Sequence, residues 1–340
     1  MKKKALFIGG TGTISSAITA ALAAGDQWDL TLLNRGSRKA EVPAGVHLLQ
    51  ADIQDAAAVE KLLVGKTWDC VADFIGFVPE HVERDWRLFR GRTAQYMYIS
   101  SASAYQKPPV SPFITEETPL ENPFWQYSRS KIACEAFLME KYRSEGFPVT
   151  IIRPSHTYGN RSVSVGTHGN KGSWQVLQRM LSGKPVLIHG DGTSLWTLTH
   201  NTDFAKGFIG LMGNPLALGE AFQITSDESL TWNQIYQTIA DVLGVPLKPY
   251  HVSSDFLATM APYDYLGNLI GDKANTVIFD NAKLKRAVPG FQATVRFADG
   301  VRDTIENILA HPELQVPDPE FDAWCDRVIA AVEAAKASFR

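Results

Sequence analysis

The chain has 340 residues, of which 45% are hydrophobic and 20% charged, with a formal net charge of −3. This length allows a substantial buried core, arranged as two lobes or as one large domain with a smaller appendage. The slightly acidic balance excludes the broad basic surface that nucleic acid or an acidic membrane would need.

The cysteine content and the hydropathy further limit the class of protein to which the chain can belong. Three scattered cysteines predict neither a disulfide framework nor a metal site. No apolar run is long enough for a signal peptide or a membrane span. We therefore expect a cytoplasmic protein without a bound metal.

Strands and helices are predicted to alternate over the first half of the chain. The apolar patterns predict buried strands at residues 4–8, 30–33, 46–50, 70–74, 96–100 and 149–153. They predict helices at residues 14–24, 55–63, 79–89 and 127–144. Strands regularly separated by helices indicate an α/β protein with a doubly wound parallel Rossmann sheet.

The second half is less regular and suggests a smaller C-terminal lobe. We expect residues 1–155 to form the Rossmann domain, with a return segment at about 186–225. Residues 156–185 and 226–340 are then expected to form the lobe that binds the substrate. Its predicted helices lie at residues 230–243, 253–261 and 299–309.

The first predicted strand runs into a glycine-rich turn, Gly9-Gly10-Thr11-Gly12-Thr13-Ile14-Ser15. Glycines permit a tight turn and let backbone N–H groups approach a pyrophosphate at a helix N-terminus. The turn lies between a strand and a helix, as a dinucleotide site requires. The residues of this turn expected to bind the cofactor are Gly9, Gly12, Thr13 and Ile14.

The second predicted strand ends without the carboxylate that usually binds the adenosine ribose. Asn34 and Arg35 stand there, followed by Arg38 and Lys39. Arg35, with Arg38 or Lys39, can pair with a 2′-phosphate, which favours NADP over NAD; the alternative is a solvated basic turn. After the third strand, Asp52-Ile53 is placed to contact the adenine edge or, alternatively, to cap a helix.

Tyr127 and Lys131 lie four residues apart in a predicted helix and therefore share one face. A free phenol titrates near pH ~10, and an adjacent ammonium stabilises the phenolate. Such a pair can move a proton at a sugar or alcohol carbon. The same spacing is also common on solvated helices, so the interpretation depends on the surrounding motifs.

Five motifs occur in a fixed order along the chain. They are the Gly9 turn, residues 100–105 (SSASAY), residues 127–135 (YSRSKIACE), residues 153–159 (RPSHTYG), and residues 190–192 (GDG) leading to 200–203 (HNTD). In this order the chain resembles the extended short-chain dehydrogenase/reductase family, as an atypical member of its NAD-dependent epimerase/dehydratase group. The resemblance covers most of the chain.

The resemblance implies roles for individual residues. Tyr127 would be the acid/base, and Lys131 would hold the nicotinamide ribose and lower the Tyr127 pKa. Ser101, with Ser103 as the alternative, would hydrogen-bond the substrate oxygen. Arg153 would lie where the chain crosses into the substrate lobe, and a structural ion pair is the other interpretation of this residue.

Some positions depart from the nucleotide-sugar members of this family. Trp196 stands where an Arg usually clamps the diphosphate, a second such Arg would fall near Asn275, and His156 replaces an Asn. Residues 101–103 also lack the Thr-Asp-Glu set of the dehydratases, so dehydration by that route is not expected. We therefore expect Ser103, His156 and Trp196 to contact a sugar-like substrate that need not carry a nucleotide, although a Trp can equally be core.

Together these features predict an NAD(P)-dependent oxidoreductase or epimerase that acts on a secondary alcohol of a sugar or sugar derivative. The alternative is a non-catalytic NAD(P) sensor or an RNA-binding protein on the same fold, as some plastid members of the group are. We expect no nucleic-acid or membrane partner. Apolar residues at 82–89 and 132–142, including Trp86 and Phe137, permit a homodimer through these two helices.

Overall fold

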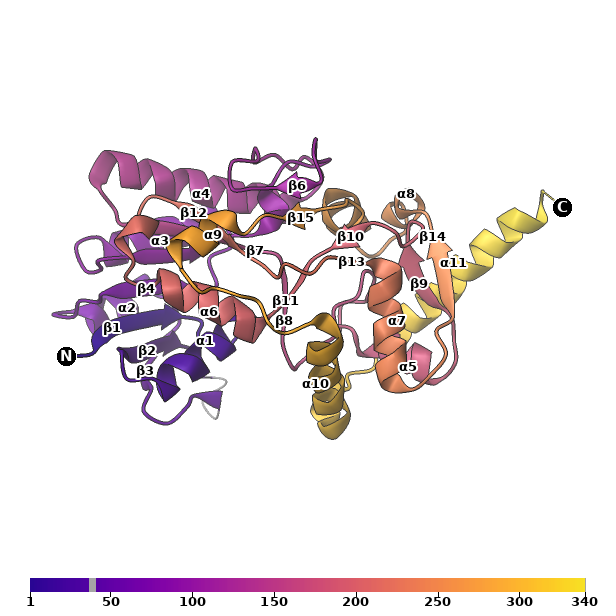
Figure 1. Cartoon of the computed structure of the whole chain (residues 1–340), viewed down its shortest axis with the longest axis horizontal. Helices are drawn as coiled ribbons and strands as arrows, with labels where there is room; N and C mark the ends of the chain where they lie inside the picture. Colours follow the sequence, from indigo (N-terminus) through magenta and orange to yellow (C-terminus); the bar gives the residue numbers. More distant parts are fainter. Residues whose placement is uncertain (37–40, 340) are drawn as a thin grey trace.

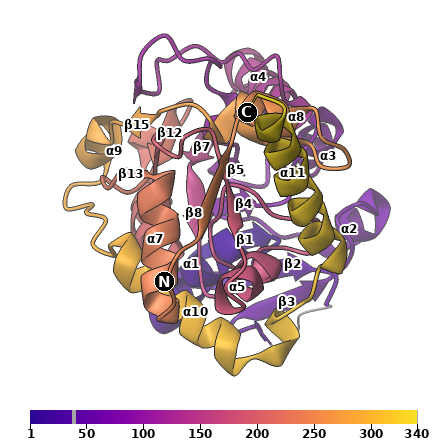
Figure 2. The ribbon, with the colours of Figure 1, turned by 90° about the vertical axis from the view of Figure 1, so that its right-hand side faces the viewer.

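A computed structural model describes residues 1–36 and 41–339. It has a lobe built around a large sheet and a smaller lobe formed mainly by the C-terminal half of the chain (Figure 1). In the end-on view of Figure 2, α7 and α11 of the smaller lobe lie in front of the sheet. In the described part of the chain, no helix is both long and apolar enough to span a membrane.

The central sheet has seven parallel strands in the order β12-β7-β5-β4-β1-β2-β3. The strands are β1 (Lys3–Ile8), β2 (Trp28–Asn34), β3 (His47–Gln50), β4 (Cys70–Asp73), β5 (Tyr96–Ile99), β7 (Val149–Pro154) and β12 (Ala221–Ile224). The chain winds outward from β1 in both directions, so the strand order reverses between β1 and β4. The predicted doubly wound Rossmann sheet is thereby confirmed.

Helices cover both faces of this sheet. They are α1 (Thr13–Ala24), α2 (Ala56–Leu63), α3 (Pro79–Phe89), α4 (Gln126–Glu145), α6 (Asn201–Leu211) and α9 (Ala282–Ala287). Because side chains alternate along a strand, Phe7 packs with α1 and α6, whereas Ile8 packs with α2, α3 and α4. Each fully buried side chain of this size contributes roughly 1.5–3 kcal/mol.

The smaller lobe has its own hydrophobic core. It contains α5 (Trp174–Leu181), α7 (Trp232–Leu243), α8 (Ser254–Ala258), the π-helix η4 (Leu266–Lys273), α10 (Phe297–Ala310) and α11 (Pro319–Ala337). Short strand pairs brace it: β8 (His156–Tyr158) with β11 (Leu198–His200), β9 (Val186–His189) with β14 (Pro249–Val252), and β10 (Leu195–Trp196) with β13 (Leu230–Thr231). A further pair joins β6 (Phe113–Ile114) to β15 (Ile278–Phe279).

The return segment expected at about 186–225 divides between the two lobes. Its first strand, β9, pairs with β14, and β10 pairs with β13. Only α6 and β12 join the sheet lobe, where α6 packs on α1 and β12 pairs with β7. The helices α5, α6, α9, α11 and η4 have no counterpart among the sequence predictions.

Candidate functional site

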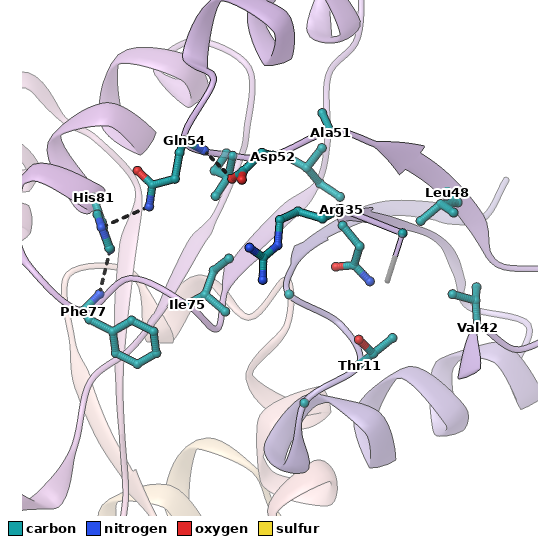
Figure 3. Close-up of a pocket in the computed structure, with 16 residues that line it drawn as sticks. Thr11, Arg35, Val42, Leu48, Ala51, Asp52, Gln54, Ile75, Phe77 and His81 are labelled. Atoms are coloured by element: carbon teal, nitrogen blue, oxygen red, sulfur yellow. Dashed lines mark hydrogen bonds between the residues drawn. The ribbon is translucent and has the colours of Figure 1, made fainter. Parts of the chain in front are cut away.

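A cavity of about 450 Å³ opens beyond the C-terminal ends of the sheet strands. Loops after β1, β2, β3 and β4 line it, as does the first turn of α3 (Figure 3). Open α/β sheets bind ligands in this position, beside the point where the strand order reverses. The lining residues include Gly9, Thr11, Gly12, Asn34, Arg35, Asp52, Ile53, Gln54, Ile75, Phe77 and His81.

The glycine-rich turn after β1 forms one wall of this cavity. Gly9 has φ 86°, and a Cβ there would lie 2.7 Å from Cγ2 of Ile75. The Ser15 hydroxyl donates to the Gly9 carbonyl at 2.8 Å and accepts from the Gly12 N–H at 2.9 Å. The turn therefore presents backbone at the N-terminus of α1, the arrangement that binds phosphate.

Two of the turn residues expected at the cofactor do not line the cavity. Thr13 and Ile14 begin α1 and are absent from its lining residues. The Thr13 carbonyl instead accepts a hydrogen bond of 2.9 Å from the Asn201 side chain, which ties α1 to α6. Gly9 and Gly12 are thus the residues of the turn that face the cavity.

Arg35 extends across the cavity toward Ile75 (Figure 3). Within residues 1–36 and 41–339, no hydrogen bond or ion pair engages its guanidinium. Arg38 and Lys39, the other basic residues expected here, lie outside the described residues. Among the described residues the Arg35 guanidinium is therefore free to pair with an anionic group of a ligand in this cavity.

The N-cap of α2 is Asp55, and Asp52 lies in the turn just before it. The Asp52 carboxylate accepts from the Gln54 N–H at 3.0 Å and so shapes the turn before α2, yet Asp52 also lines the cavity. The Gln54 side chain lies 3.2 Å from His81 Nε2, and His81 Nδ1 accepts from the Phe77 N–H at 3.2 Å. Sequence reasoning missed Phe77 and His81, although their position just after a predicted strand was the available signal.

A second cavity, of about 340 Å³, lies where the sheet lobe meets the smaller lobe. Sheet-lobe residues Ser101, Ser103 and Tyr127 line it together with residues from the smaller lobe. Those partners include His156, His168, Trp196, Asp272 and Lys273. The residues that we expected to contact substrate, Ser103, His156 and Trp196, therefore surround one space.

Tyr127 stands in the first turn of α4 and lines this second cavity. Burial raises its pKa above the ordinary value, and a hydrogen bond with the Ser101 side chain acts in the opposite direction. The expected lowering of this pKa by Lys131 is not what the structure gives. The Lys131 ammonium is 5.8 Å from the Tyr127 ring centre and donates its hydrogen bonds elsewhere.

Lys131 lies between the two cavities. Its Nζ donates to the Gly76 carbonyl at 2.6 Å and the Ile99 carbonyl at 2.7 Å, at the ends of β4 and β5. The ammonium is also 5.0 Å from the centre of the Phe77 ring, which lines the first cavity. Burial lowers the Lys131 pKa to about 8, and the nearby Asp73 carboxylate opposes that shift. Two of the three ammonium hydrogens are thus engaged, which leaves one for a ligand.

The serines after β5 form a short chain of hydroxyls. Ser101 Oγ accepts from the Ser103 N–H at 3.2 Å and lies 2.9 Å from Ser103 Oγ. Ser103 Oγ also accepts from the Ser128 hydroxyl at 2.8 Å. Ser103 is therefore held on two sides, and Ser101 is the hydroxyl that reaches Tyr127.

Arg153 forms a structural ion pair, the second of the two interpretations that its sequence position allowed. It donates to the Glu135 carboxylate through Nη2 at 2.6 Å and Nε at 3.1 Å, and to the Glu116 carbonyl through Nη1 at 3.1 Å. Both partners of the ion pair are buried, and Arg153 lines neither cavity. The ion pair links α4 to β7 beneath the site.

His156 and Trp196 contact each other across strands β8 and β10. The Trp196 Nε1 donates to His156 Nδ1 at 3.3 Å. Burial lowers the His156 pKa to about 3, so the imidazole is neutral at physiological pH. Trp196 also packs on Trp232, with ring centres 5.6 Å apart, so most of it belongs to the core of the smaller lobe.

Three charged residues of the second cavity were not anticipated from the sequence. Lys107 precedes a proline-rich loop, and Asp272 and Lys273 end the π-helix η4. Lys107 Nζ lies 3.7 Å from Asp272 Oδ1. No motif marks these residues, because their proximity to Tyr127 arises from packing between the lobes. No group of three or more His, Cys, Asp or Glu in the described residues is placed to hold a metal.

Comparison with known families matches residues 5–225 to the NAD dependent epimerase/dehydratase family. The chain is 23% identical to 2′-dehydrokanamycin reductase of Streptomyces kanamyceticus, over 85% of this chain and 80% of that protein. It is 26% identical to the chloroplast stem-loop binding protein of 41 kDa b of Arabidopsis thaliana, over 72% of this chain and 64% of that one.

Solved structures with the same fold extend over nearly the whole chain. The dTDP-glucose 4,6-dehydratase of Bacillus anthracis in complex with NAD superposes with a TM-score of 0.73 at 17% identity, covering 92% of this chain and 98% of that one. The UDP-glucuronic acid 4-epimerase of Bacillus cereus, in complex with UDP-glucuronic acid and NAD, gives 0.72 at 18% identity, covering 90% and 99%.

Proposed function

The chain belongs to the NAD dependent epimerase/dehydratase family, and on that premise we propose that it transfers a hydride between a nicotinamide dinucleotide and a secondary alcohol carbon of a sugar or sugar derivative. The similar proteins include a reductase, dehydratases and epimerases, several named for sugar substrates. The chain is an enzyme of this family, and the sugar substrate and the catalytic residues are what we propose.

The observation that carries this proposal is the position of Tyr127, Ser101 and Lys131 relative to the two cavities. The first cavity suits a dinucleotide, because backbone at the start of α1 and the Arg35 cation line it. Tyr127 and Ser101 line the second cavity, and Lys131 lies between the two. A substrate oxygen bound beside Tyr127 would therefore lie close to a cofactor that extends from the first cavity past Lys131.

In the proposed reaction, Tyr127 exchanges a proton with the substrate oxygen while Ser101 donates a hydrogen bond to that oxygen. A bound nicotinamide supplies or accepts the hydride. The remaining Lys131 donor would orient the ribose of the cofactor. Burial favours the neutral phenol of Tyr127, so in this arrangement the residue is ready to give its proton to a carbonyl that is being reduced.

The test of the catalytic role is Tyr127→Phe, assayed with NAD(P)H and a panel of keto sugars. The substitution removes only the hydroxyl, so we expect unchanged cofactor affinity and at least a hundredfold lower turnover, about the usual contribution of a general acid/base. Tyr142→Phe, on the same helix but outside both cavities, is the control. Turnover that survives Tyr127→Phe would remove this residue from the mechanism.

We also propose that NADP is preferred over NAD, because the Arg35 guanidinium in the cavity wall has no partner among the described residues. Arg35→Ala should then weaken NADPH binding by about tenfold or more and leave NADH binding nearly unchanged, as measured by fluorescence titration. Equal losses for both nucleotides would contradict this preference.

Whether the purified protein retains its nucleotide distinguishes an epimerase from a reductase. An epimerase reoxidises its nucleotide within one visit of the substrate, whereas a reductase must exchange it after each turnover. Denaturing the purified protein and identifying any released nucleotide tests this point. Retained NAD(H) would favour an epimerase, and an empty protein that binds NADPH would favour a reductase.

A second candidate is RNA binding, which the similarity to the chloroplast stem-loop binding protein favours. The net charge of −3 weighs against it, because RNA binding depends on Lys and Arg contacts to phosphates. A gel-shift titration with a stem-loop RNA, repeated at increasing salt, distinguishes the two. Salt-sensitive binding without any binding of NAD(P)H would support this second function.

A further inference from the structure

Lys273 places a buried cation in the wall of the second cavity. The residue is only 8% exposed and ends the π-helix η4. Across residues 1–36 and 41–339, its Nζ has neither a hydrogen bond nor an ion pair within 4 Å. A buried charge is costly unless it is paired, so an ammonium without a partner in a cavity wall indicates a ligand group.

The position of Lys273 is fixed by its backbone. Its carbonyl accepts hydrogen bonds from Trp232 Nε1 at 3.0 Å and from His189 Nε2 at 3.2 Å, both in the core of the smaller lobe. π-Helical turns are rare and are frequent at functional sites. The backbone that carries the Lys273 side chain is therefore anchored to the core of the smaller lobe.

The other charges in this cavity leave an excess of one positive charge. Lys107 and Asp272 face each other at 3.7 Å and offset one another. His156 and His168 also line the cavity, but burial lowers the pKa of both, so they add no charge at neutral pH. No other charged side chain of the described residues lines this space, so the formal charges of Lys107, Asp272 and Lys273 sum to one positive charge. Burial lowers the Lys273 pKa, and the neighbouring Asp272 carboxylate opposes that shift.

We propose that Lys273 binds an anionic substituent, a carboxylate or a phosphate, on the sugar ring itself. This inference rests on the proposed function, because it assumes that the substrate enters the cavity of Tyr127. The volume of about 340 Å³ is near the lower end of ligand cavities, roughly 300–1,000 Å³, and suits a substituted sugar better than a nucleotide sugar. The same charge disfavours sugars that carry ammonium groups.

The test measures binding without turnover, so that a failed catalytic mechanism would not obscure the result. Calorimetric titrations compare D-glucuronate, D-glucose 6-phosphate, D-glucose, D-glucosamine and UDP on the full chain. Two variants are compared with the wild type. Lys273→Met keeps a side chain of similar length but removes its charge, and Lys273→Arg keeps the positive charge. Lys66→Met, at an exposed lysine that does not line the cavity, is the control.

We expect the wild type to bind at least one of the two acidic sugars about tenfold or more tightly than D-glucose, and to bind D-glucosamine more weakly. That preference should disappear in Lys273→Met, return in Lys273→Arg, and persist in Lys66→Met. The two acidic sugars tell a carboxylate from a phosphate. Thermal unfolding and NADPH titration of each variant show whether it is folded.

Two outcomes would overturn the proposal. The first is a wild type that binds acidic and neutral sugars equally, or one whose preference for acidic sugars persists in Lys273→Met. The second is a loss of UDP affinity in Lys273→Met that matches or exceeds the loss for the acidic sugars, because Lys273 would then contact a nucleotide diphosphate. If Lys273→Met does not fold, Lys273→Gln and the wild-type preference itself still decide the matter.

Discussion

The buried ion pair between Arg153 and Glu135 gives the sharpest prediction about stability. The Glu135 carboxylate accepts from Arg153 Nη2 at 2.6 Å and Nε at 3.1 Å, and the Ser100 hydroxyl also donates to it. The two charged side chains are only 7% and 4% exposed. Glu135→Gln keeps the shape of the side chain but leaves the guanidinium buried without a counter-charge.

Removing one partner of a buried pair costs about 3–5 kcal/mol, and we expect a loss in this range. The multiple hydrogen bonds and the low exposure support that magnitude over the ~0–1 kcal/mol of an exposed pair. The free energy of unfolding can be measured by urea titration, following the eight tryptophans and the far-UV circular dichroism together. Coincident transitions are needed because a chain with two lobes need not unfold in one step.

Glu140→Gln is the matched control, because Glu140 is exposed on the same helix and should change stability little. The double variant Glu135→Leu with Arg153→Met should regain much of the loss, since it leaves no unpaired charge. A loss below about 1 kcal/mol for Glu135→Gln would refute the reasoning. So would a stable variant that no longer binds NADPH, because Arg153 would then belong to the site.

Two further predictions concern pH and assembly. Burial lowers the His156 pKa to about 3 from the ordinary 6.5, so between these values the unfolded chain binds more protons and the free energy of unfolding falls as the pH decreases. His156→Gln should therefore lose less stability than the wild type between about pH 7 and pH 4 in urea titrations, and parallel losses would contradict this. Trp86 on α3 and Phe137 on α4 permit a homodimer, which light scattering tests; if the protein has the mass of a dimer, Trp86→Lys should shift it toward monomer. A wild-type monomer would exclude the dimer.

The sequence predicted those features that depend on local pattern. The alternation of apolar runs with helical periods identified six of the seven strands in the central sheet and the helices up to α4, because each pattern reflects a backbone conformation that neighbouring residues determine. The turn at Gly9 was predictable for the same reason, since its φ of 86° is a backbone conformation that favours glycine.

The helix α6 shows where local pattern is insufficient. Its Gly207 and Gly210 lower helix propensity, so the segment does not read strongly as a helix. In the structure, a Cβ at Gly207 would lie 2.9 Å from the Ile224 side chain, and one at Gly210 would collide with Val288. These glycines allow close packing against β12 and the end of α9, and that packing outweighs the weak propensity.

The candidate site divides in the same way. Sequence spacing alone placed Tyr127 and Lys131 on one helix face, because that relation spans a single helical turn. Only tertiary structure paired Arg153 with Glu135 and brought Asp272 and Lys273 into the cavity of Tyr127. The reason is physical: a local pattern fixes the conformation of its own segment, whereas the partner of a buried charge depends on which distant segments pack together when the core forms.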